Sequence, residues 1–190
     1  MAELVYSMGV SLDGFIAGPD GDISWTVPSE ELHLFHNRLA EATEIHLCGR
    51  RLYETMLVWE TWEEDQPEAG AAEREFAPIW RAMPKLVFSK TLTSVEGGNT
   101  QLGTGDVVET ARALKAETEG EIAVGGAGLA AELIRAGLVD EYRLFGYPVV
   151  LGAGTPFFPP LEQPIELELV ETRDFDSRVT HLRYRANGGS

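Results

Sequence analysis

Short apolar runs alternate with amphipathic stretches along most of the chain. The apolar runs predict β-strands at residues 3–9, 45–48, 86–88, 122–124 and 138–147. The stretches between them carry apolar residues at helical spacing and predict helices from residue 29 and over 50–57, 71–83, 106–118 and 129–136. Strands and helices therefore alternate, as they do in repeated βα units.

The first predicted helix follows a Gly- and Asp-rich loop at Ser11–Pro28. The hydroxyl of Ser29 can cap this helix, and the two glutamates after it favour the first turn. Leu32, Phe35 and Leu39 then recur on one face, which predicts that this face packs on the core.

The end of the chain has a different pattern. Residues 166–175 and 178–185 are two long runs joined by Asp176-Ser177, which predicts a β-hairpin. Residues 59–70 are expected to form an acidic loop. Repeated βα units give a mostly parallel sheet with helices on both faces, and the hairpin adds antiparallel edge strands. We expect a single α/β domain over residues 1–190.

The net charge of −16 changes which ligands are plausible. Residues 1–37 contain no Lys or Arg, and no basic stretch follows. Nucleic-acid binding depends on Lys and Arg that neutralise phosphates, so this composition argues against DNA, RNA and anionic membranes. The few basic residues, particularly Arg50, Arg51, Lys85 and Lys90, become informative because a phosphorylated cofactor needs local positive charge.

A cytoplasmic location is expected from three features. Cys48 is the only cysteine and lies in an apolar run, so a buried free thiol is expected. The N-terminus has no basic region or small-residue cleavage site of a signal peptide. The longest uncharged run, 144–161, is interrupted by glycines and prolines and cannot form a spanning helix.

Three segments place notable residues at the carboxyl ends of predicted strands, where open α/β sheets bind ligands. The first is Gly125-Gly126-Ala127-Gly128-Leu129, whose backbone amides could hold a pyrophosphate at a helix N-terminus. The second is Gly49-Arg50-Arg51, where two arginines oppose the helix dipole unless an anion binds. The third is Ser89-Lys90, which could hold a ribose 2′-phosphate and select NADPH.

Each segment also has a structural explanation. The glycines could form a plain tight turn, one arginine could pair with Glu54 or Glu44, and Lys90 could be an exposed turn residue. The motif G-x-G-x-x-A at residues 126–131 lies too late in the chain, and has acids too close behind it, to be the Rossmann fingerprint.

Taken together, these segments resemble the dihydrofolate reductase superfamily. The resemblance is to the branch that contains the C-terminal reductase domain of the bifunctional riboflavin biosynthesis protein and its stand-alone relatives. It covers nearly the whole chain. It is carried by residues 11–17, Trp25, 49–54, 87–89, the Gly125-Gly126 turn and the tail 148–158.

The resemblance implies a three-layer fold, an NADPH cofactor and a homodimer. It implies that Ala17 closes over the nicotinamide and that Arg50, Arg51, Ser89 and Lys90 hold the adenosine phosphates. It places Gly49 and the Gly125–Leu129 segment on the cofactor, and Asp13, Trp25, Glu31 and Phe35 on the substrate side. The family often has Thr where this chain has Leu52. The zinc deaminase signature of the bifunctional enzyme is absent.

The expected reaction is hydride transfer to a small planar heterocycle, which could be a pterin or a riboflavin precursor of the 5-amino-6-(5-phosphoribosylamino)uracil type. Trp25 and Phe35 would sandwich the ring, and Glu31 or Asp13 would relay a proton. Glu30 replaces Glu31 if the helix register shifts by one residue. The phenylalanines of residues 157–158, or the terminal hairpin, would supply the dimer contact.

Two other classes remain open at this point. The first is a protein of the same fold that binds a nucleotide without turnover. The second is a Rossmann dehydrogenase, which would prefer NADH and carry an acid after its second strand. This chain has Gly49-Arg50 at that position. A metal site is not expected, because His33 and His36 have no evident third ligand.

Overall fold

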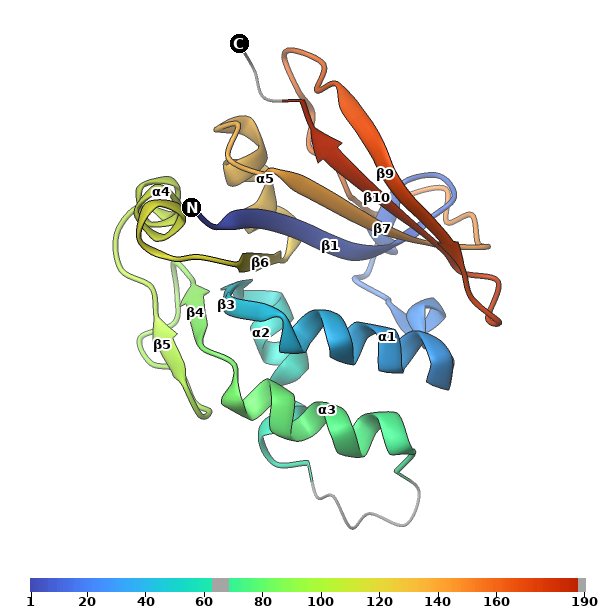
Figure 1. The fold of residues 1–190 in the computed structure, drawn as a ribbon, viewed down its shortest axis with the longest axis horizontal. Helices are drawn as coiled ribbons and strands as arrows, with labels where there is room; N and C mark the ends of the chain where they lie inside the picture. Colours follow the sequence, from blue (N-terminus) through green and yellow to red (C-terminus); the bar gives the residue numbers. More distant parts are fainter. Residues whose placement is uncertain (63–68, 188–190) are drawn as a thin grey trace.

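The computed structural model describes residues 1–62 and 69–187. Within these residues, eight strands form one sheet in the order β5-β4-β3-β6-β1-β7-β10-β9, and β2 pairs with β8 separately (Figure 1). The strands from β5 to β7 in this order are parallel, whereas β10 is antiparallel to both β7 and β9. The predicted mostly parallel sheet with a C-terminal antiparallel hairpin is confirmed.

The strands are β1 (Glu3–Ser11), β2 (Phe15–Ala17), β3 (Thr43–Gly49), β4 (Lys85–Phe88), β5 (Thr100–Leu102), β6 (Glu121–Gly125), β7 (Glu141–Tyr147), β8 (Thr155–Pro156), β9 (Leu167–Asp174) and β10 (Thr180–Ala186). The helices are α1 (Glu30–Glu41), α2 (Arg50–Met56), α3 (Ala71–Ala82), α4 (Val107–Glu117) and α5 (Ala127–Arg135), with short 3-10 turns η1 (Ser24–Thr26) and η2 (Leu57–Glu60). None of the helices in the described ranges is long and apolar enough to cross a membrane.

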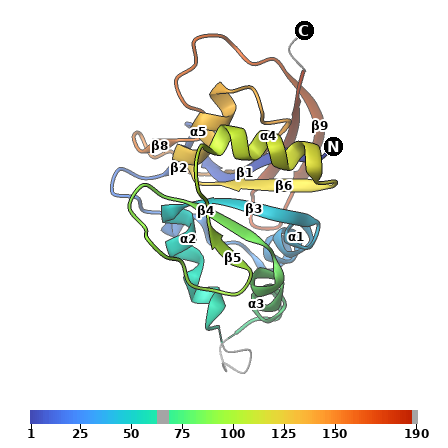
Figure 2. The same cartoon turned by 90° about the vertical axis from the view of Figure 1, so that its left-hand side faces the viewer.

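Helices cover both faces of the sheet, which gives three layers. α4 and α5 lie on one face, and α1, α2 and α3 lie on the other (Figure 2). Leu4 and Tyr6 of β1 are fully buried in the core that includes α4 and α5. On the opposite face, Cys48 and Val87 are buried with the aromatic side chains of α2 and α3. Burial raises the pKa of the Cys48 thiol to about 12, so this cysteine is a core residue, as predicted.

The start of α1 follows its sequence signals. The Ser29 hydroxyl accepts a hydrogen bond from the Leu32 amide at 3.3 Å and caps the helix. Leu32 is fully buried, and Phe35 and Leu39 pack against the same cluster. The predicted core face of this helix is confirmed.

Several expectations about loops and edges need correction. Only β9 is an edge strand of the hairpin, because β10 lies between β7 and β9. The strands β2, β5 and β8 were not expected, since each has only two or three residues. The expected acidic loop at 59–70 begins within η2, and its residues 63–68 lie outside the described residues.

Phe157 does not lie on the surface, contrary to the expectation that it supplies a dimer contact. Its side chain is 2% exposed and its ring centroid lies 4.4 Å from that of Tyr6. Phe158 packs beside it, 5.2 Å from the ring of Tyr142. The apolar character of this segment is explained by core packing. The exposed side chains of Leu169 and Val170 on β9 leave the hairpin as the candidate contact.

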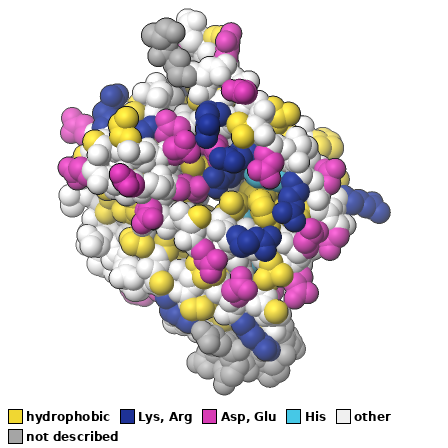
Figure 3. Space-filling model, viewed as in Figure 1, with side chains coloured by type: hydrophobic (Ala, Val, Ile, Leu, Met, Phe, Trp, Pro, Cys, Tyr) yellow, Lys and Arg dark blue, Asp and Glu magenta, His cyan; other side chains and the backbone are white. Residues whose placement is uncertain are grey.

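Basic side chains gather on one face despite the negative net charge. Figure 3 shows Lys and Arg side chains clustered over α1 and the β7–β10–β9 end of the sheet. Arg143 bonds both Glu121 and Glu141, and Arg183 bonds the fully buried Glu141 at 2.7 Å. These pairs supply the partners that buried charges need, so Arg143, Arg183 and Glu141 form a structural ion-pair network.

Candidate functional site

A crevice forms where neighbouring strands send their chains to opposite faces. β3 and β6 are adjacent and parallel, but β3 leads into α2 and β6 leads into α5, which lie on opposite faces of the sheet (Figure 2). Such a switch point leaves an opening at the carboxyl ends of the strands, where α/β proteins bind ligands. The order of elements therefore opens a cleft at the ends of these two strands, where Gly49 and Gly126 both line it.

The structure contains a cleft of about 800 Å³ at this position. That volume lies in the range of small-molecule and cofactor sites, roughly 300–1,000 Å³. Nearly all of the predicted cofactor residues line it, although they come from four separate segments. These residues are Ala17, Gly49, Arg50, Arg51, Ser89, Lys90, Gly126, Ala127, Gly128 and Leu129.

Glycines hold the turn from β6 into α5. Gly126 has φ 100° and ψ 123°, a conformation that side chains other than glycine rarely adopt. A Cβ on Gly126 would lie 3.4 Å from the Gly49 Cα, whereas a Cβ on Gly128 would meet nothing within 4 Å. The positive φ therefore favours glycine at position 126, whereas Gly128 leaves the first turn of α5 open to a ligand.

Gly125 is not among the residues that line the cleft. A Cβ at this position would lie 2.0 Å from Leu52 Cδ2 and 2.8 Å from His46 Nε2. The geometry therefore gives Gly125 a packing function, and Leu52 stands between it and the cleft. The expected direct contact of Gly125 with the cofactor has no support here.

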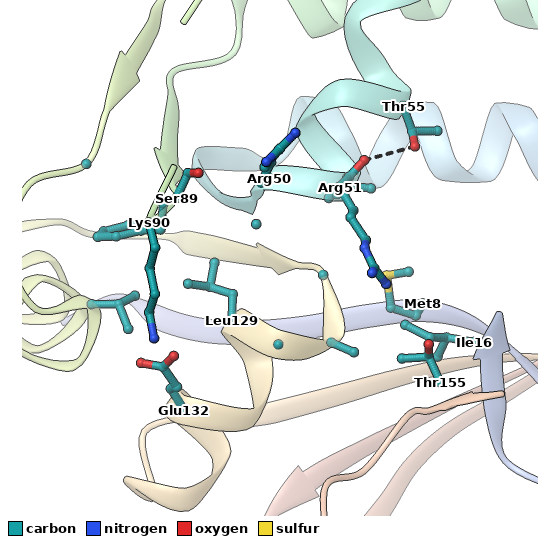
Figure 4. Close-up of a pocket in the computed structure, with 18 of the residues that line it drawn as sticks. Met8, Ile16, Arg50, Arg51, Thr55, Ser89, Lys90, Leu129, Glu132 and Thr155 are labelled. Atoms are coloured by element: carbon teal, nitrogen blue, oxygen red, sulfur yellow. Dashed lines mark hydrogen bonds between the residues drawn. The ribbon is translucent and has the colours of Figure 1, made fainter. Parts of the chain in front are cut away.

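The two arginines after β3 have different surroundings. Arg50 Nε lies 2.7 Å from the Glu54 carboxylate, and Arg50 Nη1 donates to the Thr91 hydroxyl at 2.7 Å. Arg51 has no carboxylate within ion-pair distance among residues 1–62 and 69–187. Figure 4 shows its side chain reaching into the cleft toward Met8 and Thr155. Arg51 is therefore a cation positioned for an anionic ligand. The Arg50–Glu54 pair agrees with the alternative that one arginine forms a surface ion pair.

The segment after β4 supplies a hydroxyl and an ammonium. The Ser89 oxygen accepts hydrogen bonds from the amides of Thr91 and Leu92 at 3.1 and 3.0 Å, which fixes the turn. Lys90 is exposed and extends across the cleft toward Glu132 of α5 (Figure 4). Lys90 and Glu132 both line the cleft, so the positive charge of the lysine is balanced by the negative charge of the glutamate at this end.

The opposite end of the cleft is closed by the small sheet of β2 and β8. Ala17 pairs with Thr155, and both residues line the cleft. Gly154 has φ 148°, and a Cβ there would lie 2.0 Å from the Ala17 carbonyl oxygen. Only glycine permits this approach, which brings a residue from late in the chain beside Ala17.

Asp13 lies outside the cleft lining and links two loops. Its carboxylate accepts hydrogen bonds from the Ser11 hydroxyl at 2.7 Å and from the amides of Leu151 and Gly152 at 3.1 and 2.7 Å. The Ser11 hydrogen bond is the main cause of the lowered pKa of Asp13, which stays a carboxylate at neutral pH. Its proposed catalytic function stays a prediction, since its observed bonds position the segment that precedes β8.

Glu31 also lies outside the cleft lining. Its carboxylate lies 3.2 Å from Arg173 and accepts a hydrogen bond from the Asp176 amide at 3.1 Å. These contacts join the start of α1 to the β9–β10 hairpin. Glu30 is exposed. Proton relay through Glu31 therefore stays a prediction, and the observed contacts give it a structural explanation.

Trp25 and Phe35 lie outside the cleft lining. The Trp25 indole N–H donates to the Asp22 carbonyl at 3.2 Å, and its ring meets the Tyr147 ring edge-on at 5.6 Å. Phe35 packs against the Phe175 ring at 5.2 Å and other aromatic side chains of the same cluster. Their function toward a substrate stays a prediction.

Sequence reasoning missed several lining residues. Met8, Thr55, Glu132 and Thr155 line the cleft and were not proposed. One signal was available, because Glu132 lies four residues after Gly128 and therefore on the same helix face. Within the described ranges, no group of three His, Cys, Asp or Glu side chains is arranged to hold a metal ion.

Comparison with known families agrees with this geometry. The model of the RibD C-terminal domain matches residues 2–181. This chain belongs to the RibD C-terminal domain family. The match covers both the strand ends that build the cleft and most of the hairpin.

One curated relative and one solved structure are similar to this chain over nearly their full lengths. The uncharacterized protein YyaP of Bacillus subtilis (strain 168) is 33% identical over 190 residues, which cover 98% of this chain and 96% of YyaP. A solved structure from Shewanella sp. PV-4, which carries a provisional riboflavin-biosynthesis name, has a TM-score of 0.76 and 24% identity over 98% of this chain and 99% of its own.

Dihydrofolate reductase from Enterococcus faecalis, solved in complex with NADP(H) and RAB-propyl, has a TM-score of 0.62 and 20% identity. The alignment covers 97% of this chain and 96% of the dihydrofolate reductase chain. At this level of identity the likeness shows the fold, which is that of dihydrofolate reductase.

Proposed function

We propose that this protein is an NADPH-dependent reductase that transfers a hydride to a small planar heterocycle, such as a pterin or a riboflavin precursor of the 5-amino-6-(5-phosphoribosylamino)uracil type. The observation that carries the proposal is the cleft at the β3–β6 switch point, which is lined both by the glycines at the start of α5 and by Arg51. The Arg51 guanidinium has no carboxylate within ion-pair distance in residues 1–62 and 69–187. The reductase relatives of this fold support it.

The residues of the cleft fit a dinucleotide phosphate. The backbone amides at the N-terminus of α5 carry partial positive charge and need partners, and Gly128 leaves them accessible. Arg51 adds a full positive charge, while Ser89 and Lys90 lie at the other end for a 2′-phosphate. NADPH supplies the hydride when bound. The residues of the cleft would bind NADPH and orient it toward the acceptor.

The acceptor site is the less defined part of the proposal. Met8, Ile16, Ala17 and Thr155 line the end opposite Lys90, and this end has no carboxylate among the lining residues. In the proposed reaction the acceptor carbon gains the hydride and the adjacent nitrogen or oxygen gains a proton. Solvent is the proton source that agrees with this lining, and a relay through Glu31 or Asp13 is the alternative tested below.

Titration with NADPH tests the binding half of the proposal. Calorimetry or quenching of tryptophan fluorescence should show saturable binding, and Arg51→Ala should weaken it roughly tenfold, because a charge-assisted hydrogen bond is lost. Arg135→Ala removes the same charge from an exposed residue that does not line the cleft and should leave the Kd unchanged. Absence of binding by both NADPH and NADH would end the proposal.

A turnover screen tests the other half. Oxidation of NADPH should be followed at 340 nm in the presence of pterins, pyrimidine precursors of riboflavin and quinone-like acceptors. A nucleotide-binding protein without turnover is the second candidate, and it is favoured by the structural engagement of Asp13 and Glu31. Binding without oxidation of NADPH against every acceptor would select it.

The proposal includes a cytoplasmic homodimer. The exposed apolar side chains of Leu169 and Val170 on the edge strand β9 are the candidate contact. A mass of 20.8 kDa in light scattering at micromolar protein would show a monomer and refute the dimer.

A further inference from the structure

The end of the cleft that would receive the adenosine ribose carries two opposed charges. Lys90 comes from the turn after β4, and Glu132 comes from the second turn of α5. Figure 4 shows their side chains extending toward one another across the cleft. A cation from one wall therefore faces an anion from the other at the position where a 2′-phosphate would bind.

Two other charged residues of the cleft, Asp106 and Arg50, are already engaged by neighbours. The Asp106 carboxylate accepts hydrogen bonds from the amides of Val108 and Glu109 at 2.8 and 3.0 Å, so it is engaged as the cap of α4. The charge of Arg50 is balanced by Glu54. In the described residues no hydrogen-bond donor lies within bonding distance of the Glu132 carboxylate, and this side chain faces Lys90 across the cleft.

Lys90 and Glu132 are expected to interact differently with NADPH and with NADH. An ammonium attracts the 2′-phosphate of NADPH, whereas a carboxylate repels it. A carboxylate accepts a hydrogen bond from the free 2′-hydroxyl of NADH, as an acidic residue does in NAD-binding proteins. A site with both charges favours NADPH less than a site with the lysine alone.

We propose that Glu132 is a specificity-determining residue that limits the preference of the cleft for NADPH over NADH by opposing Lys90. The proposal rests on the proposed function, because it assigns the adenosine end of the same cleft. It implies that this protein accepts both cofactors, and that the balance between them is set by one pair of side chains.

The test measures the Kd of NADPH and of NADH for four proteins by calorimetry at low ionic strength. Glu132→Gln should raise the ratio of the NADH Kd to the NADPH Kd roughly tenfold, since one repulsive charge at a partly screened site is removed. Lys90→Met should lower that ratio. The control Glu166→Gln makes the same charge change at an exposed residue outside the cleft and should leave the ratio unchanged.

The outcomes separate the two proposals. If the wild-type protein binds both cofactors and Glu132→Gln leaves the ratio unchanged, or shifts both Kd values equally, the inference about Glu132 is overturned and the proposed function stands. If the wild-type protein binds neither cofactor, both are overturned. For Glu132→Gln, high salt should lower the ratio of the NADH Kd to the NADPH Kd toward the wild-type value, because salt screens exposed charges. That result would further support a charge effect.

Discussion

Alanine at Gly126 and at Gly128 should have opposite effects on stability, although the positions are two residues apart. Gly126 holds φ 100° and ψ 123°, and an added Cβ would lie 3.4 Å from the backbone of Gly49. A side chain in such a sparsely populated conformation costs about 1–3 kcal/mol. Gly128 lies in the first turn of α5 with nothing within 4 Å of an added Cβ. Alanine there gains up to about 1 kcal/mol of helix propensity.

These free energies convert to measurable shifts. For a domain of this size, 1 kcal/mol moves the Tm by roughly 2–4 °C. Gly126→Ala, at about 2 kcal/mol, should therefore lower the Tm by roughly 4–8 °C, and Gly128→Ala should raise it by up to about 4 °C. Thermal unfolding followed by circular dichroism, with urea unfolding to check the m-value, measures both.

NADPH binding separates the folding effect from the cofactor effect. Gly128→Ala places a methyl group in the cleft, so we expect weaker NADPH binding from a more stable protein. The reasoning about the turn would be refuted if Gly126→Ala unfolds at the wild-type temperature, or if Gly128→Ala is as destabilised as Gly126→Ala. Unchanged NADPH affinity in Gly128→Ala would remove the glycine amides from the proposed phosphate site.

Three further predictions concern titratable groups. Burial lowers the pKa of both His36 and His46 to about 4, so the folded state favours their neutral forms; stability is complete above about pH 6.5 and is lost as the pH falls toward 4. The loss is on the order of 3 kcal/mol per histidine, and an unaltered pH profile of urea unfolding in the His36→Gln, His46→Gln double variant would contradict it. Glu31→Gln should weaken the contact of α1 with the hairpin by about 1 kcal/mol, since a partly exposed ion pair is lost. The pH profile of kcat should stay unchanged. A lost or shifted pH profile would instead identify Glu31 as the proton relay. Asp13→Asn should raise the KM for NADPH by disordering the loop beside Thr155, and the carboxylate mechanism is rejected if kcat is undiminished in both variants.

Much of the fold was predictable because local signals and burial agree along the sequence. The buried strands β1, β3, β4, β6 and β7 are runs of apolar residues, and the helices between them have one apolar face. The cofactor segments were predictable for a related reason. Strand ends followed by glycine or arginine are visible without knowledge of the fold, and parallel strands bring such ends to one edge.

The rest of the site depended on contacts that no local pattern contains. Thr155 reaches the cleft because β8 pairs with β2, more than a hundred residues earlier in the chain. Asp13 and Glu31 have the residue type and position of proton donors, yet long-range hydrogen bonds from the loop before β8 and from the hairpin occupy them.

The amino-acid sequence alone determined the order of strands and helices, the caps and turns, and the location of the scarce positive charges, because these depend on neighbouring residues. The tertiary structure decided which of those charges face one another, and which acids remain available to a ligand. A side chain's partners are set by the packing of distant segments. The Arg51 guanidinium therefore has no ion-pair partner in the described chain, while Lys90 faces Glu132 across the cleft.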